Sequence, residues 1–497
     1  MKVFSISSFG FNCDSVSVET DLRRGIPSID IVGISDASVK NTREMIMASF
    51  NNSLLDFQNE RILISLSPAD LKKNGTEYTL AIALSILDAQ KPFDVDEVCV
   101  FGELDVSGKI VDYFPSNNRL YNKVKSAIEM GFTKFIVPEF CEWIDDFESI
   151  EFIKVSSLKD AEEKLRNKKF KMTIKNELKE RNSSNIVFPE ITEETKNHLN
   201  ELLKKYPHAS RAVSIAIAGK LNILAYGAPG CGKTMLLQGL IPYLTPYLTF
   251  EELESVKRLY SIAGMKYTNE YIPFRMPHQT ASIEGMCGGG INCNPGEISL
   301  AHNGVLFLDE AAEFKTSVLQ MLRVPLESGC ITLSRAGRIT IYPAKFQLAM
   351  AVNPCPCGNY GEKDKICLCS AKAVEMYWKK FSAPLLDRIQ IKIHFEKDES
   401  GTGSIPLEKV KEQIENAYRI QRENGCYNRD IPASKLDEYT KENTWINNKS
   451  KDLTERAKYN VIKTAITIAN MDNRTEINES DWDEAYKLQS FSEIQFI

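Results

Sequence analysis

A glycine-rich loop between a strand and a helix constrains this chain more than any other feature of its sequence. Residues 222–226 (N-I-L-A-Y) are an apolar run typical of a buried strand, and residues 227–234 follow directly as G-A-P-G-C-G-K-T. The loop matches G-x-x-x-x-G-K-[ST], and residues 235–240 continue with a helical pattern. Its glycines allow backbone N–H groups and the helix N-terminus to converge on phosphate oxygens. The order of strand, loop and helix therefore predicts a nucleotide-binding α/β domain.

Two side chains of this loop carry specific chemistry. Lys233 would supply a positive charge for the β- and γ-phosphates, and the hydroxyl of Thr234 would hold Mg²⁺. We therefore expect ATP and Mg²⁺ as cofactors. The predicted cofactor-binding residues of the loop are Gly227, Ala228, Pro229, Gly230, Cys231, Gly232, Lys233 and Thr234.

Two further apolar runs end in polar residues that suit hydrolysis. Residues 304–308 (G-V-L-F-L) lead into Asp309 and Glu310. The aspartate would hold the Mg²⁺ shell, and the glutamate would polarise the attacking water. Residues 346–352 (F-Q-L-A-M-A-V) lead into Asn353, whose amide can orient water beside the γ-phosphate. Three strand ends with a phosphate loop, an acidic pair and an asparagine form the pattern of an AAA+ ATPase.

Length and composition set the broad class. The chain has 497 residues, 43% of them hydrophobic, and a net charge of −6. At about 150 residues per domain, this length suggests about three domains. No apolar run approaches the roughly 18 residues of a membrane-spanning helix, and the N-terminus lacks a secretory signal. We expect a soluble, cytoplasmic protein whose twelve cysteines are kept reduced. The charge balance neither requires nor excludes nucleic acid as a partner.

Changes in composition predict the domain boundaries. Strand-like and helix-like stretches alternate at first, with expected strands at 61–66, 98–101 and 134–137 and a buried helix at 77–87. A basic stretch follows at residues 163–181, and its composition is typical of a solvated helix followed by a linker. We predict an N-terminal domain at 1–165, a basic linker at 166–189, an ATPase core at 190–395, a polar linker at 396–404 and a helical domain at 405–497.

Four cysteines lie close together after the third strand. Cys355, Cys357, Cys367 and Cys369 give the spacing C-x-C-x9-C-x-C, and a turn-like polar segment separates the two pairs. Four thiolates from one short excursion can close a tetrahedral Zn²⁺ site. The C-x-C spacing is tighter than the common C-x2-C, so an iron–sulfur cluster and metal-free thiols stay open as alternatives.

Seven motifs together resemble the bacterial ComM/YifB family of magnesium-chelatase-like AAA+ proteins. The resemblance covers nearly the whole chain and implies a Lon-protease/ribosomal-S5-like α+β domain, a P-loop AAA+ core and a C-terminal helical lid. It also implies a homo-oligomeric ring, usually a hexamer, with ATP sites between subunits. The motifs are 27–40 (P-S-I-D-I-V-G-I-S-D-A-S-V-K), 67–71 (S-P-A-D-L), 102–104 (G-E-L), 273–280 (P-F-R-M-P-H-Q-T), 295–304 (P-G-E-I-S-L-A-H-N-G), 353–358 (N-P-C-P-C-G) and 385–388 (L-L-D-R).

The resemblance implies catalytic roles for two arginines. Arg388 occupies the position of the arginine finger, which reaches into a neighbour's site and contributes about 10³–10⁵ in rate. Its alternative is a surface arginine at the start of a strand over 389–393. Arg456 matches the sensor-2 arginine of the lid, whereas Asn460 and Ile466 replace arginines that the family pattern predicts.

Lon-type folds can carry a Ser–Lys protease dyad, and this chain lacks its sequence. Glu77 occupies the position expected for the nucleophile, and residues 112–123 lack the Gly-Gly-Leu-Lys pattern. Nucleophilic catalysis needs both a nucleophile and a positioned base. We therefore predict a non-catalytic N-terminal domain that serves as a platform for the ring or a partner.

A hairpin is the expected contact with DNA. Residues 331–341 (I-T-L-S-R-A-G-R-I-T-I) alternate on both sides of a turn. In related ring helicases a hairpin at this point projects a basic tip into the pore, where Arg335 and Arg338 would meet backbone phosphates. Two surface arginines are the alternative. The glycine-rich residues 286–291 are a candidate second pore loop.

Three functions follow from these motifs. The first is a ring motor that remodels recombination intermediates by branch migration, with DNA as partner and no membrane. The second is the motor subunit of a metal chelatase, which the ATPase motifs favour equally but the N-terminal domain disfavours. The third, a Lon-like ATP-dependent protease, is disfavoured by the missing dyad.

Overall fold

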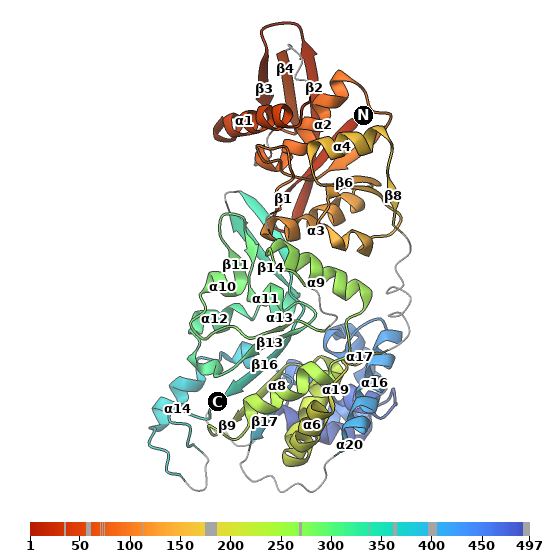
Figure 1. The fold of residues 1–497 in the computed structure, drawn as a ribbon. Helices are drawn as coiled ribbons and strands as arrows, with labels where there is room; N and C mark the ends of the chain where they lie inside the picture. Colours follow the sequence, from red (N-terminus) through yellow and green to blue (C-terminus); the bar gives the residue numbers. More distant parts are fainter. Residues whose placement is uncertain are drawn as a thin grey trace.

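In the computed structural model the described residues build two large β-sheets, one above the other in Figure 1, and two small two-stranded sheets. We call residues 1–173 the N-terminal unit, 186–395 the central unit and 405–490 the C-terminal helices. The linker expected at 396–404, and residues 174–185 of the basic linker, lie outside the described residues. The structure describes residues 1–33, 36–55, 61–69, 71, 73, 75–112, 114–173, 186–267, 271–335, 337–360, 365–395 and 405–490.

An eight-stranded sheet organises the N-terminal unit, in the order β3-β4-β2-β1-β5-β6-β7-β8. The strands expected at 61–66, 98–101 and 134–137 are confirmed as β4, β5 and β6. The last strand, β8, lies within the segment expected as the basic linker. The strands are β1 (Lys2–Phe9), β2 (Asn12–Arg23), β3 (Ser28–Val32), β4 (Arg61–Ser67), β5 (Glu97–Val100), β6 (Lys134–Pro138), β7 (Glu151–Val155) and β8 (Lys171–Met172).

Helices cover both faces of this sheet because its central strands are apolar on both sides. On β1, Val3 packs into a core that includes helix α2, while Ile6 packs into a second core that includes α3. Successive side chains of a strand point to opposite faces, so these two cores lie on opposite sides of the sheet. The helices are α1 (Asp36–Asn52), α2 (Thr79–Gln90), α3 (Phe114–Glu129) and α4 (Leu158–Arg166).

Helix α2 is buried along most of its length. Its residues from Thr79 to Leu87 are all buried, as expected of a helix that is apolar all round. The helix predicted at 77–87 is therefore confirmed, except that its first residues belong to the 3₁₀ turn η1 (Gly75–Tyr78). Glu77 of this turn is exposed.

A five-stranded, all-parallel sheet organises the central unit, in the order β10-β13-β16-β9-β17. The strands predicted at 222–226, 304–308 and 346–352 are confirmed as β9, β13 and β16. The strand expected from residue 389 begins later, as β17. Because the strands are parallel, their carboxyl ends meet at one edge of the sheet. The strands are β9 (Ile223–Gly227), β10 (Phe274–Arg275), β13 (Val305–Leu308), β16 (Gln347–Val352) and β17 (Ile391–Phe395).

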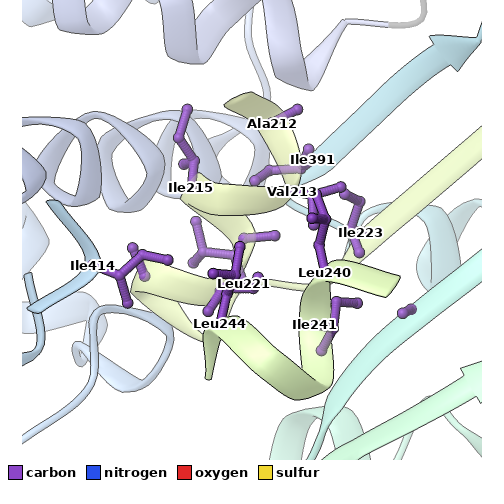
Figure 2. Close-up of a cluster of buried hydrophobic side chains, with 14 of the residues drawn as sticks. Ala212, Val213, Ile215, Leu221, Ile223, Leu240, Ile241, Leu244, Ile391 and Ile414 are labelled. Atoms are coloured by element: carbon purple, nitrogen blue, oxygen red, sulfur yellow. The ribbon is translucent and has the colours of Figure 1, made fainter. Parts of the chain in front are cut away.

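The C-terminal helices share one hydrophobic core with the central unit. Figure 2 shows Ile414 of α16 in the same cluster as Ile215 of α7, Leu240 of α8 and Ile223 of β9. The predicted helical character of this region is confirmed. The larger helices are α6 (Glu193–Lys205), α7 (Pro207–Gly219), α8 (Lys233–Leu244), α9 (Phe250–Ile262), α16 (Leu407–Glu423), α17 (Ala433–Glu442), α18 (Thr444–Lys449), α19 (Glu455–Met471) and α20 (Glu479–Gln489).

Two small hairpins project from the central unit toward the N-terminal unit (Figure 1). The hairpin predicted at 331–341 is confirmed: β14 (Cys330–Arg335) pairs antiparallel with β15 (Arg338–Pro343), and Arg335 is opposite Arg338. The glycine-rich segment forms a second hairpin, β11 (Gly288–Gly289) with β12 (Asn294–Pro295).

Helix α9 holds the N-terminal unit against the central unit. The guanidinium of Arg258 donates to Asn122 at 2.6 Å and to Ser126 at 2.8 Å, and it lies over the ring of Phe11 at 4.2 Å. At the β1–β2 turn, the backbone N–H of Phe11 donates to Thr340 of β15 at 2.9 Å. None of the helices in the described ranges is long and apolar enough to cross a membrane.

Candidate nucleotide-binding site

The phosphate loop joins β9 directly to α8, in a conformation that only glycine adopts without strain. Gly232 has φ +102°, and a Cβ on it would lie 2.4 Å from the hydroxyl of Tyr206. Gly227 has φ +156°, and a Cβ there would lie 2.5 Å from the carbonyl oxygen of Phe395. Both positions therefore require a residue without a Cβ atom, which explains why the motif has glycine at this spacing.

Lys233 is buried at the N-terminus of α8 and points back into the loop. Its ammonium donates to the carbonyl oxygens of Gly227 at 2.6 Å and Ala228 at 2.8 Å, and to Oδ1 of Asn353 at 3.3 Å. A positive charge thus lies at the centre of the loop, where the phosphates of a nucleotide would be bound. Asn353 reaches this charge from the end of β16.

Thr234 and Asp309 form an oxygen pair suited to Mg²⁺. The threonine hydroxyl donates to Oδ1 of Asp309 at 2.9 Å, and the backbone N–H of Glu310 donates to the same oxygen at 3.0 Å. Mg²⁺ prefers hard oxygen ligands and commonly takes one or two carboxylates together with substrate phosphates. The residues present therefore fit the ion that the motif implies.

Glu310 is held in an unusual conformation at the end of β13. Its φ of +47° is in the left-handed region, which is uncommon for a residue other than glycine and is often found at functional sites. Its carboxylate accepts a hydrogen bond from the amide of Gln279 at 2.5 Å. Sequence analysis included Gln279 in the family motif 273–280 but gave it no role, because only the folded chain brings residues 279 and 310 together.

Arg388 lies at the opposite edge of the central sheet. Its carbonyl accepts from the side chain of Asn222, which immediately precedes β9, whereas the phosphate loop follows the end of β9. The five residues of β9 at about 3.3 Å each separate the two edges by roughly 16 Å. The backbone of Arg388 therefore lies far from the phosphate loop of the same chain.

Glu327 brings the two predicted catalytic arginines together. Its carboxylate pairs with the guanidinium of Arg388 and, at 3.3 Å, with that of Arg456. The hydrogen bond and charge of Arg388 hold the pKa of Glu327 below its usual range. Sequence analysis also missed this glutamate, since nothing in its local sequence distinguishes it from other surface acids.

A buried amide network fixes the backbone around Arg388. Asn460 of α19 donates to the carbonyl of Asp387 at 2.7 Å and accepts from Gln390 at 3.0 Å. Gln390 in turn accepts from the backbone N–H of Asn222 at 2.9 Å. The asparagine found where the family pattern predicts an arginine thus connects the C-terminal helices to the sheet.

The four cysteines converge beside the phosphate loop. Their Sγ atoms all lie within 4.8 Å of one another, and Cys355 is 3.4 Å from Cys357 and 3.7 Å from Cys367. Four ligands at about 2.3 Å from a tetrahedral zinc would be about 3.8 Å apart, so the cluster fits this ion. A Cβ on Gly358 would lie 2.6 Å from Pro229, so the cysteine segment packs against the loop.

Arg335 and Arg338 lie far from these groups, at the tip of the β14–β15 hairpin. Arg335 is exposed, and the guanidinium of the half-buried Arg338 lies 5.2 Å from the centre of the Phe9 ring. The structure therefore brings Lys233, Thr234, Asp309, Glu310 and Asn353 to one edge, and it places the remaining predicted arginines elsewhere.

Comparisons with known proteins match both sheets. A family model described as magnesium chelatase, subunit ChlI, matches residues 200–402, and one described as subunit ChlI of Mg-chelatase matches residues 18–140. The chain is 31% identical to the competence protein ComM of Haemophilus influenzae, over 96% of this chain and 94% of that protein. It is 30% identical to YifB of Escherichia coli, over 99% and 97% of the two chains. A protein of Mycobacterium tuberculosis is 32% identical over 85% and 82%.

Substitutions at Lys233 and Glu310 are expected to separate nucleotide binding from hydrolysis. Lys233→Ala removes the charge at the centre of the loop, so ATP affinity should fall. Glu310→Gln leaves the loop intact but removes the carboxylate that we expect to polarise water, so ATP should still bind while hydrolysis slows by about 100-fold or more. Binding of a fluorescent ATP analogue and phosphate release would measure the two effects. Wild-type affinity in a folded Lys233→Ala protein would contradict the site.

Proposed function

Because the chain belongs to the ComM/YifB family of magnesium-chelatase-like AAA+ proteins, we propose that it is a ring-forming ATPase that moves along DNA. The family implies ATP hydrolysis with Mg²⁺. Branch migration during recombination or DNA uptake is the task that we assign to it, with DNA and other copies of the same chain as partners. The observation that carries this proposal is the hairpin with Arg335 and Arg338 at its tip.

The arginines of the hairpin suit a sequence-independent grip. In the described part of the chain, neither Arg335 nor Arg338 lies within ion-pair distance of a carboxylate. Guanidinium groups bind phosphate oxygens in a bidentate way, and contacts to the backbone alone do not depend on base sequence. A motor that moves over any DNA needs this kind of contact. The relative from Haemophilus influenzae is named a competence protein, and this name is consistent with a role in handling DNA.

The positions of the catalytic groups support an active site shared between subunits. Lys233 would bind the phosphates, Thr234 and Asp309 would hold Mg²⁺, and Glu310 would take the proton of the attacking water. Asn353 would orient that water. Arg388 and Arg456 share Glu327 at the other edge of the sheet. We therefore assign both arginines to the site of a neighbouring subunit in a ring, which is a hexamer in our proposal.

We retain the division into an N-terminal Lon/S5-like domain, an AAA+ core and a helical lid, with the boundaries given above. Glu77 forms an ion pair with Lys123 at 2.6 Å in the N-terminal unit. A carboxylate at the expected nucleophile position that is neutralised by a lysine supports a non-catalytic role for this domain. It also argues against the protease alternative.

The motor subunit of a metal chelatase is the second candidate. The descriptions of both matching family models favour it, since they name the chelatase subunit ChlI. It predicts ATP hydrolysis that responds to partner subunits and a tetrapyrrole and is indifferent to DNA. An ATPase assay with single-stranded, duplex and forked DNA therefore separates the two candidates, because only the DNA motor is stimulated by DNA.

We further propose that Cys355, Cys357, Cys367 and Cys369 bind a structural zinc. The fit of the four sulfur atoms to a tetrahedron supports this assignment. Bound there, the ion would cross-link the segment after Asn353, and the contact between Gly358 and Pro229 would transmit that rigidity to the phosphate loop.

The trans position of Arg388 predicts complementation in mixed rings. Arg388→Ala leaves the phosphate loop intact, and Lys233→Ala leaves the finger intact. A mixture of the two inactive proteins should recover part of the ATPase activity, because some interfaces then combine a normal loop with a normal finger. Phosphate release against mixing ratio would measure this effect. No recovery, when co-assembly is demonstrated by a pull-down of differently tagged subunits, would exclude a shared site.

The hairpin prediction concerns salt dependence. Arg335→Ala with Arg338→Ala should make the plot of log affinity against log salt shallower, by about 0.9 for each duplex phosphate that is no longer neutralised. Stimulation of the ATPase by forked DNA should fall as well. Lysines at the two positions should restore more binding than alanines do, because the charge is retained. Arg24→Ala, at an exposed arginine far from the hairpin in sequence, is the control. Wild-type binding and fork remodelling by the double variant would refute the hairpin as the DNA grip.

The zinc assignment predicts a stoichiometric metal. Elemental analysis of the purified protein should find about one zinc per chain, and Cys367→Ser should lower this content. The thermal unfolding midpoint should fall at the same time, because a structural zinc stabilises the folded state. Cys426→Ser, which removes a cysteine outside the cluster, is the matched control. Unchanged zinc content and stability in Cys367→Ser would rule out the site, and iron in place of zinc would identify the alternative cluster.

A further inference from the structure

A large cavity lies between the N-terminal unit and the two hairpins of the central unit. Its volume is about 750 Å³, within the range of about 300–1,000 Å³ typical of ligand sites. Figure 1 shows β11 and β14 at the end of the central unit that faces β1 and α3. The proposed catalytic groups do not line this cavity, so it is separate from the nucleotide site.

The charges that line the cavity are mainly positive. Five cationic and two acidic side chains contribute to its walls: Lys73, Arg119, Lys123, Arg335 and Arg338, against Glu77 and Glu103. Burial alone would lower the pKa of Lys123, but the charges of Glu77 and Tyr78 outweigh that effect and raise it. Lys123 and Glu77 therefore form an ion pair whose two charges cancel each other. The remaining cationic side chains outnumber the remaining acid, so the cavity keeps a net positive charge.

Three arginines are available to bind an anion there. Arg119 projects from α3 and is exposed, and Arg335 and Arg338 come from the hairpin. Among the residues that the structure describes, none of the three has a carboxylate within ion-pair distance. Guanidinium groups in this situation are suited to phosphate, which they bind in a planar, two-pronged arrangement.

Aromatic rings line the same cavity. Phe9 and Phe140 are among the lining residues and neither is fully buried, and the guanidinium of Arg338 lies over the ring of Phe9 at 5.2 Å. A positive groove combined with exposed aromatic rings is the usual composition of sites for single-stranded nucleic acid, because phosphates meet the charges while bases stack on the rings. A free inorganic anion would not stack on the aromatic rings.

The two candidate pore loops meet at this cavity. Ile291, Asn292 and Asn294, at the glycine-rich hairpin, line it together with the arginines of the β14–β15 hairpin. The hydroxyl of Tyr342 in β15 donates to the carbonyl of Cys293 at 2.7 Å, which joins the two hairpins. A strand gripped by either loop would therefore already be at the mouth of the cavity.

We propose that this cavity is a binding site for single-stranded nucleic acid, built jointly by the N-terminal unit and the hairpins. The inference rests on the proposed DNA contact of Arg335 and Arg338, and it adds Arg119 and Phe140 of the N-terminal unit to the path of the strand. The confined volume suits one strand, since a duplex would bring two backbones and a paired stack. The N-terminal unit then contacts the bound strand directly, in addition to serving as a platform.

Binding of a labelled oligothymidine at several salt concentrations tests the proposal in the full-length protein. Arg119→Ala should make the log–log salt plot shallower by about 0.7, the value for one single-strand phosphate contact. Phe140→Leu should weaken binding by about 5- to 150-fold, the range for removal of one stacked base, and should leave the salt slope unchanged. Arg24→Ala, at an exposed arginine of the same unit that does not line the cavity, should bind like wild type.

The outcomes separate this inference from the proposed function. If Arg335→Ala changes the salt slope while Arg119→Ala and Phe140→Leu bind like wild type, the cavity is not the path and the hairpin contact still stands. If all three variants bind like wild type, both proposals fail. Cross-linking of an oligonucleotide that carries 4-thiothymidine is a second measurement, independent of variant stability. Cross-links in residues 119–140 would support the proposal, and cross-links confined to the hairpins would overturn it.

Discussion

A single buried asparagine at the start of β9 organises the part of the molecule on which the site depends. The side chain of Asn222 accepts a hydrogen bond from the backbone of Leu348 in β16 at 2.8 Å and donates to the carbonyl of Arg388 before β17 at 2.8 Å. It thus ties the two strands that flank β9 at one edge of the sheet. Buried amides of this kind are costly to leave unpaired, so the register of the three strands is strongly specified. The parallel direction then places the phosphate loop at the other edge.

The consequence is a site divided between two edges of one sheet. Lys233, Asp309 and Asn353 meet where the strands end, and Arg388 is fixed where they begin. This separation of the phosphate loop from Arg388 is the physical basis of our proposal that a second copy supplies the arginine to each site. Helix α19, which carries Arg456, is tied to the backbone beside Arg388 through Asn460, so the two arginines are held close together.

Local sequence predicted the helices and strands better than it predicted the side-chain contacts between them. The three strands around the phosphate loop were recognised because each is a short apolar run followed by polar residues, and the β14–β15 hairpin because its alternation reverses around a turn. Gln279 and Glu327 could not be found in this way, since their partners are distant in sequence and surface-type residues carry no local signal. The start of β17 was misplaced by two residues because Ile389 is apolar and buried without being part of the strand. The cavity is likewise a product of how two units pack, and no segment of the sequence contains it.

Helix α9 explains how events at the two ends of the molecule can be linked. Near its start, Glu252 pairs with Lys220 at 3.0 Å and accepts from Tyr427 of the C-terminal helices at 2.9 Å. Burial would raise the pKa of Glu252, but Lys220 and the surrounding hydrogen bonds lower it to about 2, so the carboxylate is charged at neutral pH. Less than two turns later, Arg258 binds the N-terminal unit.

Helix α9 therefore contacts the C-terminal helices, the core of the central unit and the wall of the cavity. A displacement of α9 would therefore change contacts with the C-terminal helices and with the N-terminal unit at the same time. In the motor that we propose, this helix would connect the nucleotide site to the bound strand without direct contact between strand and nucleotide.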